Sequence, residues 1–130
     1  VILVDEQNEL GGSILGNRDS VGDISASDWC AKNITELKEM KEVQLLTRST
    51  VFGYYDHNFL AVVERVSDHL PVGSFKWPRQ RIWRIRAKEV VLTTGAIERP
   101  LVFGNNDRPG VMLASAVSTY INRYAVVPGS

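Results

Sequence analysis

The stretch KEVVLTTGAIERPLVFGNNDR, residues 88–108, constrains the fold of this chain more than any other. Its apolar run VVLT leads directly into Thr94 and Gly95. A short run rich in β-branched residues that ends at a glycine is typical of a strand buried on both faces of a parallel sheet. An acid, a base and a proline at 98–100 then mark a loop. Because ligands bind at the carboxyl ends of the strands in open α/β sheets, we expect a ligand site there.

The first residues of the chain have a similar pattern. VILV at positions 1–4 ends at Asp5 and predicts a second buried parallel strand. The next loop contains Gly11 and Gly12, whose backbone can approach a ligand or another part of the chain closely. A plain turn is the alternative for such a pair, and for an isolated pair it is the more frequent outcome. We expect the two strands to form two walls of one nucleotide site whose third wall lies outside this sequence.

A helix is predicted after the glycine pair, from about residue 28 to residue 41. Ser25 or Ser27 is expected to cap it, and the polar residues 17–25 are expected to form a loop. Apolar residues recur at helical spacing on one face, which includes Cys30. No histidine or second cysteine lies near Cys30 in the sequence, so we interpret it as a small buried hydrophobic residue and not as a reactive thiol.

An antiparallel meander is predicted next. EVQLLTR at 42–48 has the composition of a strand, and two further strands at 50–55 and 59–66 flank the turn Asp56-His57-Asn58. His57 is therefore expected at the surface, as part of a turn and not of a catalytic site.

The strand predicted at 81–89 alternates between two faces. Its basic face carries Arg84, Arg86 and Lys88. One interpretation is a strip that binds phosphate, and the other is the outer face of a half-exposed strand. We favour the second, because no aromatic residues interleave on the basic face and the charges of the whole chain balance.

A second helix is predicted at 113–124, where apolar residues recur at helical spacing, and residues 125–130 are expected to be a linker or a cut end. Because the chain begins inside an apolar run without an initiator methionine, we expect it to be a piece of a longer protein.

Composition bounds the remaining possibilities. The 130 residues suit one domain, and a hydrophobic content of 44% favours a globular core over disorder. Fifteen basic and fifteen acidic residues cancel, which argues against nucleic acid or a membrane as partner. One cysteine fits a reducing, cytoplasmic location. The two histidines have no acidic or cysteine partners at ligand spacing, so no metal site is predicted.

The order of these elements resembles the first nucleotide domain of the two-dinucleotide-binding flavoprotein superfamily. The resemblance implies an α/β fold: a partial Rossmann-like FAD/NAD(P)-binding domain over residues 1–124, in which the meander is inserted into the parallel sheet at about 48–88. In that superfamily the acid that ends the second strand binds the adenosine ribose. The closing strand reads as hydrophobic residues followed by A-T-G, which VVLTTG resembles. The cofactor-binding residues implied are Asp5, Glu6, Gly11, Gly12, Val51, Thr94 and Gly95, with no catalytic residue.

TGAIERPLVFGNNDRPGVML and VILVDEQNELGGSILG narrow the resemblance to the alpha subunits of heterotetrameric sarcosine oxidases. Members of that family oxidise sarcosine to glycine and hydrogen peroxide and pass the one-carbon unit to tetrahydrofolate. The resemblance implies a flavin-dependent amine oxidase with NAD or FAD in this domain and FMN at a subunit interface. It also implies beta, gamma and delta subunits as partners.

The sequence departs from the superfamily pattern in two places. It contains no GxGxxG, and Glu9 and Ser13 stand where basic residues often flank the glycine pair. We therefore expect this chain alone to bind nucleotide weakly or not at all. Two other interpretations stay open. One is another FAD- or NAD(P)-dependent oxidoreductase, such as an opine oxidase or a pyridine nucleotide-disulfide-type enzyme. The other is a non-enzymatic module whose basic strand face binds an anionic partner.

Overall fold

The computed structural model describes residues 1–73 and 76–129 of the chain. Residues 74–75, in the predicted meander, and Ser130, in the predicted linker, lie outside the described residues. The chain divides into two compact units. The first consists of Val1–Leu10 and Ile34–Leu92, and the second of Gly11–Asn33 and Thr93–Ser130.

A parallel strand pair begins the first unit. β1 (Ile2–Val4) pairs with β4 (Gln44–Leu46), with Ile2 opposite Gln44 and Val4 opposite Leu46. Parallel neighbours need a long crossover, usually through a helix, and the connection between these two strands contains α1. Leu46 is buried, as expected for a strand whose side chains face a core. The parallel strand predicted at the start of the chain is confirmed, but its partner is β4, which the sequence analysis placed with the antiparallel meander.

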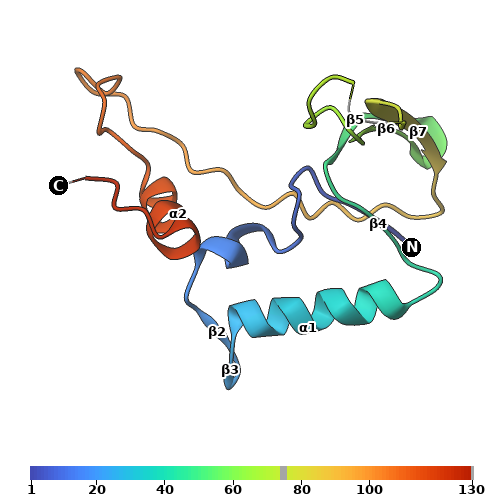
Figure 1. The fold of residues 1–130 in the computed structure, drawn as a ribbon, viewed down its shortest axis with the longest axis horizontal. Helices are drawn as coiled ribbons and strands as arrows, with labels where there is room; N and C mark the ends of the chain where they lie inside the picture. The colour runs from blue at the N-terminus through green and yellow to red at the C-terminus, as the bar shows by residue number, and fades with distance from the viewer. Residues whose placement is uncertain (74–75, 130) are drawn as a thin grey trace. The chain divides into compact units, whose positions relative to one another are not determined.

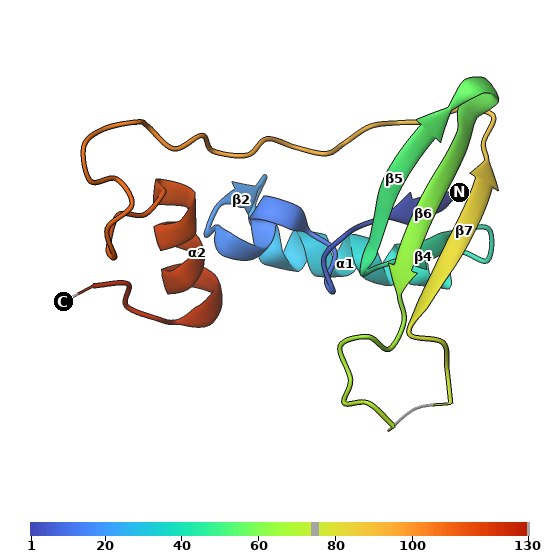
Figure 2. The ribbon, with the colours of Figure 1, turned by 90° about the horizontal axis from the view of Figure 1, so that it is seen from above.

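The antiparallel meander completes the first unit (Figure 2). β5 (Ser49–Tyr55), β6 (Phe59–Arg65) and β7 (Gln80–Arg86) lie in that order in one sheet. The short turn η2 (Asp56–Asn58) joins the first two strands, and exposed His57 lies in it with a φ of 60°. Val62 in the central strand is fully buried. The predicted meander and its turn are confirmed.

The helix α1 (Ala26–Glu39) begins at the cap that the sequence predicts. The Ser25 hydroxyl oxygen accepts a hydrogen bond from the Asp28 N–H at 3.1 Å and donates one to the Asp28 carboxylate at 2.6 Å. This contact satisfies a backbone donor that the first helical turn leaves without a partner. Cys30 lies on the buried side of the helix, with 7% of its surface exposed, as predicted.

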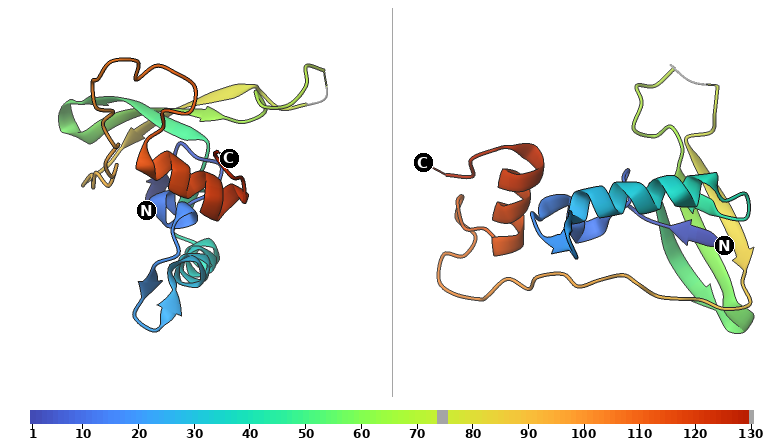
Figure 3. Two further views of the ribbon diagram at one scale, coloured as in Figure 1. Left: turned by 90° about the vertical axis from the view of Figure 1, so that its left-hand side faces the viewer. Right: turned by 90° about the horizontal axis from the view of Figure 1, so that it is seen from below.

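A short hairpin precedes α1 in the second unit, where the sequence predicts a loop (Figure 3). β2 (Ser20–Val21) pairs antiparallel with β3 (Ile24–Ser25). Gly22 has a φ of 62° in the turn, a conformation that glycine adopts without strain. A Gly-Asp pair flanked by β-branched residues is a hairpin signal, so the sequence did contain the information.

The glycine-rich loop is ordered against the second helix within the second unit. η1 (Gly12–Gly16) is a short 3₁₀ helix, and α2 spans Ala114–Tyr124. The Gly16 carbonyl accepts hydrogen bonds from Ser118 Oγ at 3.2 Å and from Asn122 Nδ2 at 3.0 Å. The segment predicted as a loop therefore contains a short helix that is hydrogen-bonded to α2.

The predicted buried strand at 90–95 is wrong for this structure. The segment has no helix or strand (Figure 1), and Val91 and Leu92 are 82% and 71% exposed. A β-forming sequence becomes a strand only where another strand offers hydrogen-bonding partners, and no strand of the described chain pairs with this segment. The residue types favour a strand here, but the segment does not form one because no neighbouring strand pairs with it.

Candidate functional site

Asp5 occupies the carboxyl end of the parallel strand pair. Its N–H donates to the Leu46 carbonyl at 2.9 Å, and its carbonyl accepts from the Ser49 N–H at 2.8 Å. These bonds tie the end of β1 to the end of β4 and to the first residue of β5. The half-buried Asp5 therefore lies where three strands of the first unit converge.

The Asp5 carboxylate has acceptor capacity to spare. Its Oδ1 accepts a hydrogen bond from the Gln7 N–H at 2.8 Å, which fixes the turn after β1. No other donor of the described chain is recorded on this carboxylate. An ionised carboxylate has about four lone-pair sites, so Oδ2 can accept from hydroxyl groups of a ligand.

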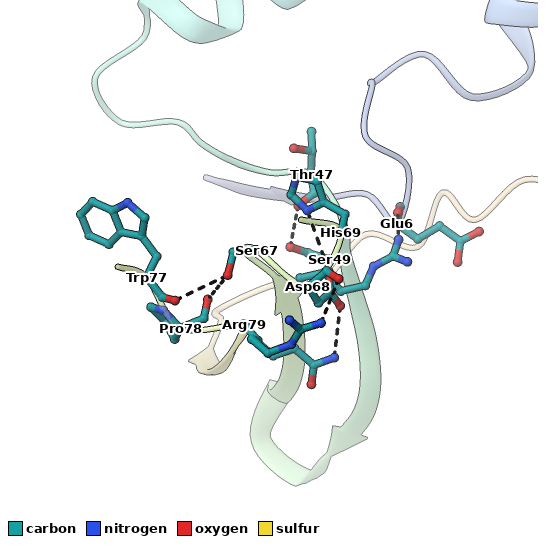
Figure 4. A network of polar contacts seen from close by, with 11 residues as sticks. Glu6, Thr47, Ser49, Ser67, Asp68, His69, Trp77, Pro78 and Arg79 are labelled. Atoms are coloured by element: carbon teal, nitrogen blue, oxygen red, sulfur yellow. Dashed lines mark hydrogen bonds and ion pairs between the residues drawn. The ribbon is translucent and has the colours of Figure 1, made fainter. Parts of the chain in front are cut away.

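The turn after Asp5 is held by hydrogen bonds to two of its backbone carbonyls. The Glu6 carbonyl accepts from Arg65 Nη2 at 2.9 Å, as Figure 4 shows, and the Gln7 carbonyl accepts from the Arg48 N–H at 2.8 Å. The exposed Glu6 thus contributes its backbone to the structure, and its side chain is directed by no recorded contact in the described chain.

Val51 lies two residues beyond Ser49 on β5, roughly 7 Å along the strand from the Asp5 contact. β5 is an edge strand, so alternate backbone groups face away from the sheet and can pair with a ligand. A bulge at Phe52 follows directly and turns the strand. Asp5, Glu6 and Val51 therefore lie in the same region of the first unit, and their role in nucleotide binding stays a prediction.

Gly11 and Gly12 begin η1 and have different surroundings. A Cβ at Gly11 would lie 2.9 Å from Cys30 Sγ and 3.0 Å from Leu15 Cδ2, and the Gly11 φ is 132°. A Cβ at Gly12 would meet nothing within 4 Å. Gly11 is thus required by packing within its own unit, which agrees with the plain-turn alternative, whereas Gly12 leaves open space beside the backbone.

Thr94 and Gly95 are exposed, and they lie in the segment that was predicted to be a strand and is not one. A Cβ at Gly95 would meet no atom within 4 Å, so no close approach of the described chain requires glycine there. Their role in nucleotide binding stays a prediction. Nor do the described contacts join these two residues to Gly11 and Gly12 in the second unit.

Two buried serines that the sequence did not single out support the first unit (Figure 4). Ser49 is 1% exposed, and its Oγ donates to the Thr47 carbonyl at 2.9 Å. Ser67 is 2% exposed, and its Oγ donates to the Pro78 carbonyl at 3.0 Å. Serine in a short polar segment gives no signal of burial, so only the structure could identify these bonds.

The loop before α2 lines an open pocket of about 260 Å³ in the second unit, together with the start of that helix; the lining residues include Glu98, Arg99, Phe103 and Met112. Glu98 Oε2 accepts a hydrogen bond from the Ser115 N–H at 2.8 Å. The side-chain and backbone hydrogen bonds from Ser115 lower the pKa of Glu98 below its usual value of 4.5. The sequence analysis placed Glu98 in a loop and missed its contact with the helix.

Among residues 1–73 and 76–129, no group of three His, Cys, Asp or Glu side chains could hold a metal ion. None of the described helices is long and apolar enough to cross a membrane.

Comparison with known proteins shows that the whole of this chain matches a part of each of several longer proteins. It is 49% identical over 129 residues to sarcosine oxidase subunit alpha of Rhizobium meliloti (strain 1021), which covers 99% of the chain. It is 48% identical, over its whole length, to the subunit of the same name from Corynebacterium sp. (strain P-1). The chain resembles part of sarcosine oxidase subunit alpha throughout its length. The resemblance drawn from the sequence is therefore confirmed, and the chain spans 13% and 14% of these two relatives.

No family model matches the chain. Among solved structures, L-proline dehydrogenase from P. horikoshii is similar, with a TM-score of 0.74 and 24% identity. The match covers 99% of this chain and 24% of that one. At this identity the likeness concerns the fold, and it supports the mixed α/β architecture with parallel and antiparallel sheets.

Proposed function

We propose that this chain is the adenosine-side part of a dinucleotide-binding domain in the alpha subunit of a flavin-dependent amine oxidase that resembles sarcosine oxidase. One observation carries the proposal: the Asp5 carboxylate lies where β1, β4 and β5 converge and has unfilled acceptor capacity. The identity of 46–49% to sarcosine oxidase alpha subunits supplies the chemical context.

In this proposal Asp5 and the edge of β5 bind different parts of the adenosine. The Asp5 carboxylate accepts hydrogen bonds from the two neighbouring ribose hydroxyls, a pairing that suits an ionised acceptor. The backbone near Val51 pairs with the adenine, and the turn at Glu6 keeps the carboxylate oriented. In the second unit, a Cβ at Gly12 or at Gly95 would meet no atom within 4 Å, so the backbone is open at both positions.

The dinucleotide is NAD or FAD. A flavin bound in the complete assembly accepts the electrons of the amine, and residues of this chain bind and orient a nucleotide without joining in that step. The complete protein then works with beta, gamma and delta subunits in the cytoplasm and converts sarcosine to glycine, hydrogen peroxide and a one-carbon unit for tetrahydrofolate.

Titration of NAD and FAD into the complete alpha subunit tests the proposal. We expect saturable binding of one dinucleotide per subunit by calorimetry, with AMP or ADP-ribose as competitor because the contacts are to the adenosine half. Absence of competition by adenosine nucleotides would contradict the placement of the site. The isolated chain is expected to bind weakly or not at all, and sub-micromolar binding to it would contradict that expectation.

An opine oxidase is the alternative that the sequence left open. The complete assembly distinguishes the two, since oxygen consumption with sarcosine and not with an opine supports the first proposal. A disulfide-type enzyme is disfavoured because the one cysteine of this chain, Cys30, is buried.

A further inference from the structure

One face of the meander gathers aromatic rings and arginines from three strands. The register places Tyr55 opposite Phe59, and Phe59 opposite Arg86, so these three lie on the same face. Two more cross-strand pairs, Ala61–Arg84 and Val63–Ile82, share that face. We call it the arginine–aromatic face; it consists of Tyr55, Phe59, Ala61, Val63, Ile82, Arg84 and Arg86.

The aromatic part of this face is ordered in advance. The Tyr55 and Phe59 ring centroids are 5.9 Å apart, and Arg86 Cζ lies 5.9 Å from the Phe59 centroid. The Tyr55 ring lies across Gly53, because a Cβ at Gly53 would be 2.5 Å from Tyr55 Oη. Groups fixed in this way lose little conformational freedom on binding, which favours association.

The outer strands of this face are exposed, whereas Ala61 on the central strand is buried. Ile82 is 67% exposed and Tyr55 is 55% exposed, although both lie in a regular sheet. Tyrosine and arginine are enriched at protein interfaces, and an apolar residue among them is typical of the centre of such a surface.

The charge on this face has one sign. The pairing register puts Arg84 and Arg86 on it and puts Glu64 on the opposite face, where Glu64 binds Trp83 and Arg81. In the described part of the chain no carboxylate forms an ion pair with either arginine of the face. A binding partner that supplies carboxylates would therefore neutralise both.

We propose that the arginine–aromatic face binds an acidic surface of another subunit, with carboxylates opposite Arg84 and Arg86 and an apolar side chain over Ile82. The proposal rests on the proposed function, because the relatives are named as subunits of an oxidase. A protein partner is favoured over nucleic acid, since the chain has no net charge and the face includes an exposed apolar residue, Ile82. The aromatics come from β5 and β6, which the pattern along β7 could not reveal.

Charge reversal in the complete assembly tests the proposal. We expect Arg84→Glu combined with Arg86→Glu to raise the dissociation constant of the subunits about tenfold or more and to reduce its salt dependence. Lys32→Glu combined with Lys38→Glu, on exposed positions of α1, is the matched control and should leave the constant unchanged. Equal effects of the two double variants would overturn the proposal. Hydrogen exchange in β7 checks that the sheet stays folded, and Ile82→Ser gives a second reading without a charge change.

A photocrosslinking residue at Ile82 identifies the partner. Adducts to an Asp- or Glu-rich segment of another subunit support the proposal, whereas adducts only within the same polypeptide, adducts to nucleic acid, or no adduct overturn it. Dinucleotide binding should be unchanged in the Arg84→Glu, Arg86→Glu variant. Failure of the wild-type subunit to bind dinucleotide would therefore count against the proposed function alone, and an unchanged subunit affinity against the interface alone.

Discussion

Glu98 Oε2 accepts a hydrogen bond from the Ser115 N–H at 2.8 Å, across a loop that separates the two residues in sequence. Leu113, at the cap position of α2, provides no side-chain hydrogen bond to the helix. Glu98 therefore satisfies one of the backbone donors that the first turn of the helix leaves free, and its negative charge lies at the positive end of the helix dipole.

This contact predicts a pH dependence of α2. The Ser115 hydrogen bonds lower the pKa of Glu98, so the carboxylate stabilises the folded state above about pH 4.5. That contribution is lost as the pH falls through the lowered value, because protonation removes the charge. Hydrogen exchange in the first turn of α2 should quicken over this range. Glu98→Gln should remove the pH dependence, and Glu89→Gln, at an exposed position without a recorded contact, should not.

Substitution of Gly11 tests the packing of η1. Gly11→Ala should lower the free energy of local unfolding of residues 10–33 by about 1–3 kcal/mol, because the residue has a φ of 132° and the new methyl group meets Cys30 Sγ at 2.9 Å. Adding Cys30→Ala should recover part of the loss. Hydrogen exchange of the complete polypeptide measures both effects.

Gly12→Ala is the control for Gly11→Ala, since its φ of 53° carries the backbone strain without any close contact. A loss at Gly12 as large as that at Gly11 would contradict the role of Cys30.

The sequence predicted the elements whose neighbours are close along the chain. The Ser25 cap and the hairpin at His57 depend on a few adjacent residues, and both were predicted correctly. The apolar run at the start of the chain predicted the parallel strand β1, but its partner β4 was assigned to the antiparallel meander. Of the predicted site, Asp5 is hydrogen-bonded to Ser49, the first residue of the strand that contains Val51.

The errors concern contacts between distant residues. The run at 90–95 has a strand composition, yet pairing depends on a partner that composition cannot specify. The Glu98–Ser115 bond and the Tyr55–Phe59–Arg86 group likewise join positions through the fold. A periodic pattern along one segment cannot show which residue of another segment a side chain will contact.

Glu64 is predicted to stabilise the meander from its buried side. Its Oε2 accepts hydrogen bonds from Trp83 Nε1 at 2.7 Å and from Arg81 Nη1 at 3.0 Å. Glu64→Ala leaves the partly buried indole N–H without this acceptor, so the free energy of local unfolding of β6 and β7 should fall by about 1–3 kcal/mol. Glu36→Ala, at an exposed position of α1, is the control and should change it by less than about 0.5 kcal/mol. Comparable losses in both variants, measured by hydrogen exchange, would argue against the network.

Asp5 is predicted to determine nucleotide retention. Asp5→Asn keeps an acceptor for the Gln7 N–H but removes the charge that favours the ribose hydroxyls. In the complete alpha subunit the dissociation constant of the dinucleotide should therefore rise about 10- to 100-fold, while hydrogen exchange at Gln7 stays slow. Glu6→Ala should change the constant less than about twofold, because Glu6 holds its turn through its backbone carbonyl. Calorimetric titration of the two variants decides the assignment, since equal losses would mean that Asp5 acts on the turn and not on the ligand.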